Sequence, residues 1–297
     1  MRKKVHLARH LVDALLRHVE KARGNLAETR EGSDESIHDA RKVLKQARAA
    51  LRLLRSGLTR DEFDELNASL RDAGAAVSAV RDAIALDEAF ARLKERERKK
   101  ERLTAGVADH VQSALAAKRF ASVKSLHTDV VSLHRNVDRL TKILPKIRSL
   151  SGRLEGIDLA QGLRRQYKKT VQALRLVRKT QESRALHEWR KQVKYLYNAV
   201  SDVMGADAKP TARFVSRAEK LADVLGDEHD LAEMERWLIE FTGASLGAQE
   251  RDQVVKVIAL ERQHLRRRAL RVSRGLFTRS ARGFARYVLA SGASFPR

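Results

Sequence analysis

The chain carries one pattern twice, at positions half its length apart. The segments SIHDARKVLKQARAALRLLR (36–55) and ALHEWRKQVKYLYNAVSDV (185–203) share the spacing H-[DE]-x-R-K-x-x-K. The pattern begins at His38 in the first segment and at His187 in the second, an offset of 149 in a chain of 297 residues. A repeat on this scale predicts a fold built from two related units.

The repeat continues on both sides of this pattern. Two basic residues upstream recur with the same spacing, Arg17 with Arg165 and Lys21 with Lys169. Downstream, an aspartate follows the histidine by 44 residues in the first copy (Asp82) and by 43 in the second (Asp230). We therefore expect one domain over the whole chain, made of a first half at 1–150 and a second half at 151–297.

Both halves are predicted to be helical throughout, which makes the fold class all-α. Proline occurs only three times, and apolar residues recur at spacings of three and four rather than two. Ser33 or Asp34 is the expected N-cap of the second helix, and 144–156, with Pro145 and Gly156, is the expected linker between the halves. The expected helices span about 4–29, 34–56, 60–92, 94–118, 121–143, 157–181, 184–204, 210–240, 246–275 and 279–290.

A stripe of basic side chains runs along the helix expected over 36–55. Steps of three and four residues connect His38, Arg41, Lys45, Arg48, Arg52 and Arg55. An apolar stripe from Ile37 to Leu54 lies about 100° away around the helix, so one flank packs and the adjacent flank presents cations. The second copy repeats the beginning of the basic stripe at His187, Arg190 and Lys194.

A basic stripe of this kind has two interpretations, a solvated surface or a binding face. Ordinary helix surfaces mix both signs, because like charges at i,i+4 repel by about 0.2–0.5 kcal/mol. Six stripe positions without a carboxylate, partly repeated in the second copy, favour a binding face. The second stripe continues with uncharged residues from Tyr197 onward, so the strongest ligand positions are expected in the first two turns of each helix.

The overall charge points to a polyanionic partner. The 61 Lys and Arg against 38 Asp and Glu give a net charge of +23, shared about equally by the two halves. Such a charge favours nucleic acid, polyphosphate or an anionic membrane surface as a partner. The basic N-terminal segment has no uninterrupted apolar run, so neither a signal peptide nor membrane insertion is expected.

Catalysis and cofactor binding have no positive support in the sequence. The absence of cysteine excludes disulfides, thiolate metal sites and Cys nucleophiles, and fits a reducing, cytoplasmic location. No phosphate-binding glycine loop, nucleophile elbow or zinc-protease motif occurs. The segment GDEHD (226–230) is the only metal-like cluster, and no further His or carboxylate cluster with recognisable spacing accompanies it. The sequence therefore predicts no enzyme, no cofactor and no metal.

Three segments together resemble the CHAD family, the conserved-histidine α-helical domain. They are IHDARKVLKQARAALRLLR, LHEWRKQVKYLYNAV and LADVLGDEHDL, and the resemblance covers nearly the whole chain. It implies two four-helix bundles related by pseudo-twofold symmetry, with a basic groove or pore between them. It also implies binding of long-chain inorganic polyphosphate and association with polyphosphate granules.

The resemblance also implies which residues bind the polymer. Many relatives have Arg at the position of Tyr197, which weakens the distal end of the second site. His38 and His187, which begin the two stripes, are expected to lie in the groove, to donate hydrogen bonds and to gain charge below about pH 6.5. The implied ligands are Arg17, Lys21, His38, Arg41, Lys42, Lys45, Arg48, Arg52, Arg165, Lys169, His187, Arg190, Lys191 and Lys194.

Two other functions remain open at this point. A nucleic-acid-binding protein is the main alternative, although such proteins usually interleave aromatic residues with cations for base stacking. This chain has only 14 Phe, Tyr and Trp residues, and the first basic stripe contains none. A phosphatase or kinase acting on polyphosphate would need metal-binding carboxylates beside the basic rows, and the sequence places none there.

Overall fold

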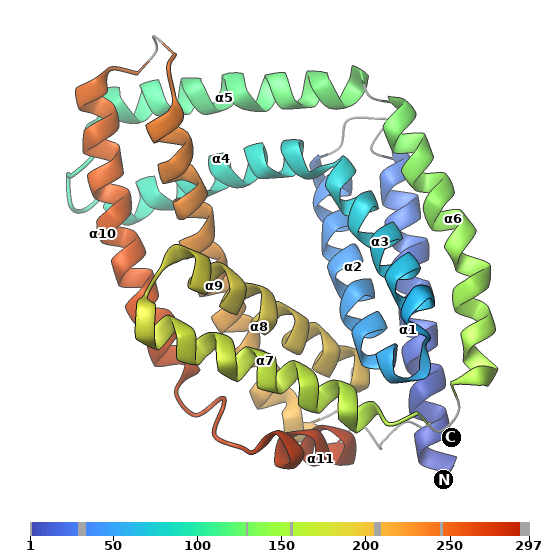
Figure 1. Cartoon of the computed structure of the whole chain (residues 1–297). Coiled ribbons are helices and arrows are strands. Elements are labelled where there is room, and N and C mark those ends of the chain that lie inside the picture. The colour runs from blue at the N-terminus through green and yellow to red at the C-terminus, as the bar shows by residue number, and fades with distance from the viewer. Residues whose placement is uncertain are drawn as a thin grey trace.

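The computed structural model describes residues 2–28, 34–128, 130–154, 157–204, 209–243 and 246–291. Every regular element in these ranges is a helix, which confirms the all-α prediction (Figure 1). In chain order the elements are α1 (Arg2–Glu28), α2 (Asp34–Leu53), the short 3-10 turn η2 (Leu54–Gly57), α3 (Arg60–Ala76), α4 (Ser78–Glu97), α5 (Ala105–Thr128), α6 (Val130–Arg153), α7 (Leu159–Thr180), α8 (Ser183–Met204), α9 (Lys209–Glu240), α10 (Ala248–Ser273) and α11 (Ala281–Ser291).

The helices pack as two groups that meet along α2 and α8. In the first group α1 packs on α2 and α6, and α3 packs on the same two helices. In the second group α8 lies between α7 and α9, while α10 packs on α9 and α11 packs on α7. Helix α4 departs from the first group, because it packs on α5 and on α9 of the second group, as Figure 1 shows.

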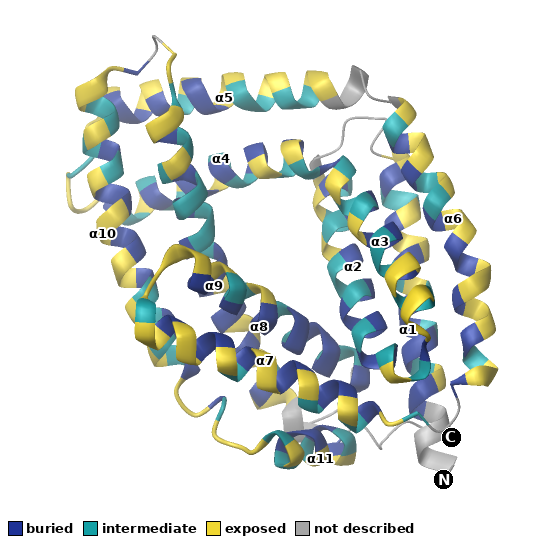
Figure 2. Cartoon of the chain, viewed as in Figure 1, coloured by how far each residue is buried: buried dark blue, intermediate teal, exposed yellow. Residues whose placement is uncertain are grey.

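The predicted apolar stripes of α2 and α8 form part of the core. Leu51 and Trp189 are completely buried, and Ile37, Leu44 and Val193 are nearly so. Burying a side chain of this size stabilises the folded state by about 1.5–3 kcal/mol. Figure 2 shows that α8 is buried along much of its length, because helices cover it on several sides. Within the described residues, no helix has the combination of length and apolar character needed to cross a bilayer.

The single helix predicted over 60–92 is wrong, because the structure divides it at Val77. This residue has φ −110° and ψ 15°, outside the helical region, and it ends α3. The last carbonyl groups of a helix have no partner within it. One of them, the carbonyl oxygen of Gly74, accepts a hydrogen bond from Nη1 of Arg41 at 3.2 Å. The break thus helps to fix a residue of the basic stripe.

The helix predicted over 94–118 is also wrong at its start. Helix α4 continues to Glu97, a turn follows, and α5 begins at Ala105. Glu97 is buried and accepts hydrogen bonds from Lys100 and Arg102, while Glu101 adopts a left-handed conformation with φ 51°. The segment between the two helices has few apolar side chains to bury, so these charged hydrogen bonds turn the chain instead.

The predicted linker over 144–156 is helical for most of its length. Helix α6 passes through Pro145 and ends at Arg153, so the expected division after residue 150 falls inside it. A proline inside a helix costs about 3 kcal/mol. Burial of Ile143, Ile147 and Leu150 offsets this cost. Two other predicted positions, Ser33 and Gly156, lie outside the described residues.

Candidate anion-binding site

Two adjoining cavities lie where α2, α4, α8 and α9 approach one another. The first has a volume of about 560 Å³ and is lined by His38, and we call it the His38 cavity. The second has a volume of about 630 Å³ and is lined by His187, and we call it the His187 cavity. Four Lys and Arg residues, here named the central cations, are among those that line both cavities: Arg41, Lys45, Arg190 and Lys194.

The two basic stripes reach these cavities because α2 packs directly on α8. On α2, His38 and Lys42 line only the His38 cavity and Arg48 lines only the His187 cavity, which His187 and Lys191 of α8 line as well. The structure therefore brings together nine of the predicted ligands: His38, Arg41, Lys42, Lys45, Arg48, His187, Arg190, Lys191 and Lys194.

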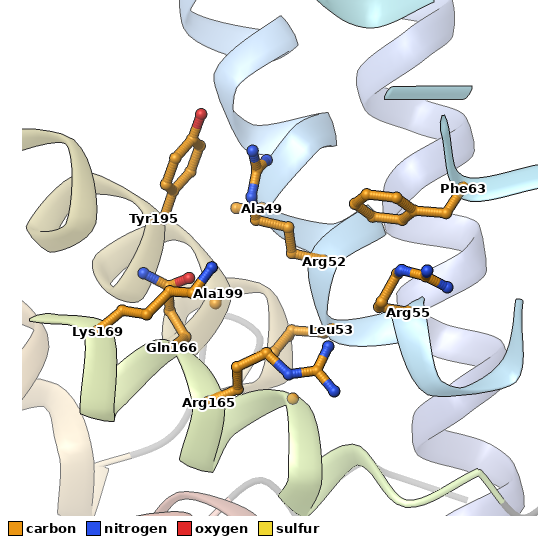
Figure 3. A pocket seen from close by; sticks show the side chains of 11 residues that line it. Ala49, Arg52, Leu53, Arg55, Phe63, Arg165, Gln166, Lys169, Tyr195 and Ala199 are labelled. Carbon is orange, nitrogen blue, oxygen red and sulfur yellow. The ribbon is translucent and has the colours of Figure 1, made fainter. Parts of the chain in front are cut away.

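Three further predicted ligands line a separate pocket, which we call the Arg165 pocket. It has a volume of about 250 Å³ and lies between the end of α2, α7 and α8 (Figure 3). The predicted residues there are Arg52, Arg165 and Lys169, joined by Arg55. Tyr195 lines both this pocket and the His187 cavity. The sequence pattern alone does not separate this pocket from the central cations.

The remaining predicted ligands on α1 lie elsewhere. Neither Arg17 nor Lys21 lines any of the three cavities. Arg17 is exposed, and Lys21 lies 3.5 Å from Asp39 on the neighbouring helix α2. The correspondence of these residues with Arg165 and Lys169 in the repeat therefore does not extend to a shared cavity.

Two ion pairs occur at corresponding positions of the sequence repeat. Nη2 of Arg41 lies 3.7 Å from Oδ1 of Asp82, and Nη2 of Arg190 lies 4.0 Å from Oδ1 of Asp230. The aspartates are the two residues that follow the repeated histidines in the sequence. Each aspartate reaches one end of a guanidinium group, and the Nε donor of each arginine has no hydrogen-bond partner among the described residues.

Buried donors without acceptors surround the central cations. In the described part of the chain, Nε of Arg41, Nε of Arg190 and Nη1 of Arg81 are buried and have no hydrogen-bond partner. A buried donor without an acceptor costs about 1–3 kcal/mol. The three unpaired N–H groups mark a position where an oxyanion would supply the missing acceptors.

The two central lysines have no ion-pair partner in the described part of the chain. Burial, followed by the charges of Lys194 and Arg41, lowers the pKa of Lys45 to about 7. Burial and then the charge of Arg190 lower the pKa of Lys194 to about 8. The unliganded protein thus holds both ammonium groups at the edge of deprotonation near neutral pH, a condition that a bound anion would reverse.

The histidines are less easily charged than expected. Burial and then the charge of Arg81 lower the pKa of His38, and burial and then the charge of Arg190 lower the pKa of His187. Nδ1 of His187 lies 3.4 Å from Nδ1 of His229, whose pKa burial and Arg190 lower to about 3. The expected gain of charge just below pH 6.5 is therefore wrong for the unliganded protein. Neutral imidazoles still offer N–H donors.

Carboxylates from α4 and α9 reach the cavities, contrary to the expectation from the basic stripes. Seven Lys and Arg side chains line the His38 cavity together with six carboxylates, whereas the His187 cavity has eight against four. Glu219, Asp223 and Asp227 form the i,i+4 series on α9 that carries this charge. Searching α9 for such a series would have detected it. Within the described residues, no group of three or more His, Asp or Glu is placed to hold a metal ion.

Other lining residues were not selected from the sequence. Arg81, on α4, is the residue before Asp82 and corresponds to His229 in the repeat. The alignment of the two repeats places Arg81 opposite His229, but the two side chains differ chemically, so the repeat pattern did not select them. Tyr197 does line the His38 cavity, where its hydroxyl donates to Glu219 at 3.0 Å. Burial and this carboxylate raise the pKa of Tyr197 to about 12, so it remains a neutral donor.

Comparison with known proteins assigns the family. The model of the CHAD domain matches residues 13–239, which include both basic stripes, α9 almost to its end and every lining residue of the His38 cavity. No curated protein matches the chain. Helices α10 and α11 lie beyond the matched residues. Because the match covers well over half of the sequence, the chain belongs to the CHAD domain family.

Proposed function

We propose that this protein binds long-chain inorganic polyphosphate at the central cations, without catalysing a reaction, and that it associates with polyphosphate granules in the cytoplasm. The observation that carries the proposal is the set of buried, unpaired N–H donors on Arg41, Arg81 and Arg190. These arginines line the His38 cavity together with Lys45 and Lys194, which form no ion pair in the described part of the chain. A ligand with many oxygen acceptors and a high charge satisfies both deficits at once.

The chemistry of polyphosphate suits this arrangement. Each internal phosphate carries one charge and presents oxygens on all sides, so recognition requires donors rather than stacking surfaces. Arginine binds oxyanions through its planar fork of donors, and lysine contributes a compact charge. The His187 cavity has the larger excess of cations, so the polymer is expected to contact that side more strongly. Membership of the CHAD family supports the same ligand.

We further infer that the fold consists of two related halves with the polymer-binding groove between them. Several packing pairs support this inference, because they have counterparts in the other half. The pair α1–α2 corresponds to α7–α8, α1–α6 to α7–α11, and α4–α5 to α9–α10. The repeated ion pairs of Arg41 and Arg190 agree with the same relation. On this assignment the division lies near residues 154–158, after α6, rather than at 150.

Nucleic-acid binding is the second candidate, and one observation favours it. Trp237 and Tyr195 both line the His187 cavity, where an aromatic ring could stack on a base. The guanidinium carbon of Arg52 already covers the ring of Tyr195 at 4.0 Å, however. Trp237 packs on Phe241, with ring centroids 5.3 Å apart. A single partly occupied ring is a poor platform for successive bases.

A double substitution tests the proposal. Lys45→Gln with Lys194→Gln removes two central charges while leaving no carboxylate unpaired. We expect the affinity for long-chain polyphosphate, measured by titration calorimetry at physiological salt, to fall at least about 100-fold, since two charged phosphate contacts are lost together. Circular dichroism should show unchanged helicity.

The matched control is Lys99→Gln with Lys256→Gln, which removes the same charge from exposed positions outside the three cavities. It should change the affinity less than about threefold. Equal losses in both variants would show that net charge alone attracts the polymer. Tighter binding of single-stranded RNA than of polyphosphate by the wild-type protein, at matched charge concentration, would favour the nucleic-acid alternative.

A further inference from the structure

The Arg165 pocket differs from the other two cavities in its charge. Four cations line it, and none of its lining residues is a carboxylate. The His38 and His187 cavities, in contrast, contain acidic side chains from α4 and α9. Figure 3 shows that the cations come from two opposing sides, Arg52 and Arg55 from the end of α2 and η2, and Arg165 and Lys169 from α7.

A close contact between backbones creates this juxtaposition. A Cβ atom on Gly162 would lie 2.9 Å from the carbonyl oxygen of Leu53 and 3.0 Å from its Cα. Only glycine therefore permits α7 to approach the end of α2 so closely. One turn further along α7, Arg165 is thereby placed opposite Arg52 and Arg55 (Figure 3).

The two arginines on the α2 side are held in place by contacts that leave some donors free. Nη1 of Arg52 donates to the carbonyl oxygen of Arg48 at 3.0 Å, and its guanidinium lies over the ring of Tyr195. Nη1 of Arg55 donates to the carbonyl oxygen of Leu58 at 3.1 Å, and its guanidinium carbon lies 4.6 Å from the ring centroid of Phe63. Cations fixed by neutral groups keep their full charge available to a ligand.

The two cations on the α7 side have no such contacts. Within the described residues, neither Arg165 nor Lys169 forms an ion pair or a hydrogen bond through its side chain. Gln166, between them, is buried and donates instead to the carbonyl oxygen and side chain of Gln192. The Arg165 pocket is thus lined by two cations that neutral contacts hold in place and by two cations without side-chain contacts. No carboxylate among its lining residues neutralises them.

The dimensions of the pocket limit the ligand. Its volume of about 250 Å³ lies below the roughly 300–1,000 Å³ typical of sites for drug-sized molecules and cofactors. A nucleotide needs a site of that larger class, whereas a few linked phosphate groups do not. Tyr195, covered by Arg52, stands between this pocket and the His187 cavity. The ligand is therefore small, highly charged and bound apart from the central cations.

We propose that the Arg165 pocket is a second phosphate site, which binds a short oligophosphate separately from the central cations. The ligand chemistry has two sources: the end of a long polyphosphate chain, or free pyrophosphate and tripolyphosphate. The first source rests on the proposed function, because it requires the polymer to lie in the adjacent cavity. The second source does not.

The test measures tripolyphosphate binding in the variant that lacks the central lysines. In the background Lys45→Gln with Lys194→Gln, calorimetry should still detect one molecule of tripolyphosphate per chain. Adding Arg165→Glu with Lys169→Glu should weaken this binding at least tenfold. Adding Arg175→Glu with Lys179→Glu, which has the same chemistry and spacing on the same helix but lies outside the pocket, should change it less than twofold.

Each outcome bears on the pocket independently of the proposed function. The second site would be overturned if the Lys45→Gln with Lys194→Gln protein did not bind tripolyphosphate. It would also be overturned if the two α7 variants lost equal affinity. Both conclusions hold even if the wild-type protein binds the polymer. Because both α7 pairs are exposed, folding is not at risk, and circular dichroism verifies it. Long chains with free ends should displace tripolyphosphate, and end-capped chains should not, if chain ends are the source. Failure of both to compete would assign the pocket to free oligophosphates.

Discussion

At the scale of single residues, the central lysines show a conflict between stability and binding. A half-buried ammonium group without an ion-pair partner destabilises the unliganded fold, and burial lowers the pKa of Lys45 and of Lys194 accordingly. The same absence of a carboxylate leaves each lysine available to a phosphate. Arg41 and Arg190 form ion pairs with aspartates, so the site combines paired guanidinium groups with unneutralised ammonium groups.

This conflict predicts the pH dependence of binding. A bound phosphate favours the charged lysine, so the pKa of Lys45 rises from about 7 when the ligand binds, and binding takes up a proton above pH 7. Polyphosphate affinity should therefore fall between pH 7 and 9, by up to about tenfold per pH unit for one fully coupled proton. Calorimetry at constant ionic strength measures it. The double variant Lys45→Arg with Lys194→Arg, which stays charged at both positions, should flatten the profile, because Lys194 also titrates in this range with a pKa of about 8. A flat wild-type profile would contradict the prediction.

At the scale of elements, the sequence predicted α2, α8 and α9 closely but missed the start and the end of α4, which also lines the cavities. The boundaries of α2 and α8 follow from strong apolar periodicity, and both helices were placed within a few residues. The sequence did not predict the break at Val77, and the helix that follows it packs on α9, a tertiary contact that no local pattern encodes. For the same reason the carboxylates Asp223 and Asp227 were not assigned to the site, since their position depends on how α9 crosses α2 and α8.

The continuous helix α6 gives a prediction about Pro145. This exposed proline lies in the interior of α6, where its missing N–H and its ring weaken the helix. Pro145→Ala should raise the free energy of unfolding by about 1–2 kcal/mol, because the regained hydrogen bond exceeds the entropy that alanine adds to the unfolded chain. Urea denaturation measures the change. Lys142→Ala, one turn earlier and also exposed, should stay within about 0.5 kcal/mol. A destabilised Pro145→Ala protein would mean that the proline is required at this position.

At the scale of the whole molecule, the folded unit extends beyond the residues that define the family. The match ends at residue 239, yet α10 packs along α9 and α11 packs on α7. Glu228 on α9 is buried, and it accepts hydrogen bonds from Arg262 at 3.0 Å and Arg266 at 2.9 Å, both on α10. The face of α9 opposite the cavities therefore depends on a helix outside the match.

This dependence predicts that a chain ending at Glu240 does not fold stably. Removing α10 breaks both ion pairs of Glu228 and exposes the face of α9 that α10 covers. Each large apolar side chain that loses its burial costs about 1.5–3 kcal/mol, against a total stability of about 5–15 kcal/mol. Loss of the apolar contacts of Ile258 and Leu265 adds to it. Thermal melts followed by circular dichroism should show no cooperative transition for the 1–240 chain. A 1–240 chain that melts cooperatively at the Tm of the full protein would instead show that the matched residues fold without α10.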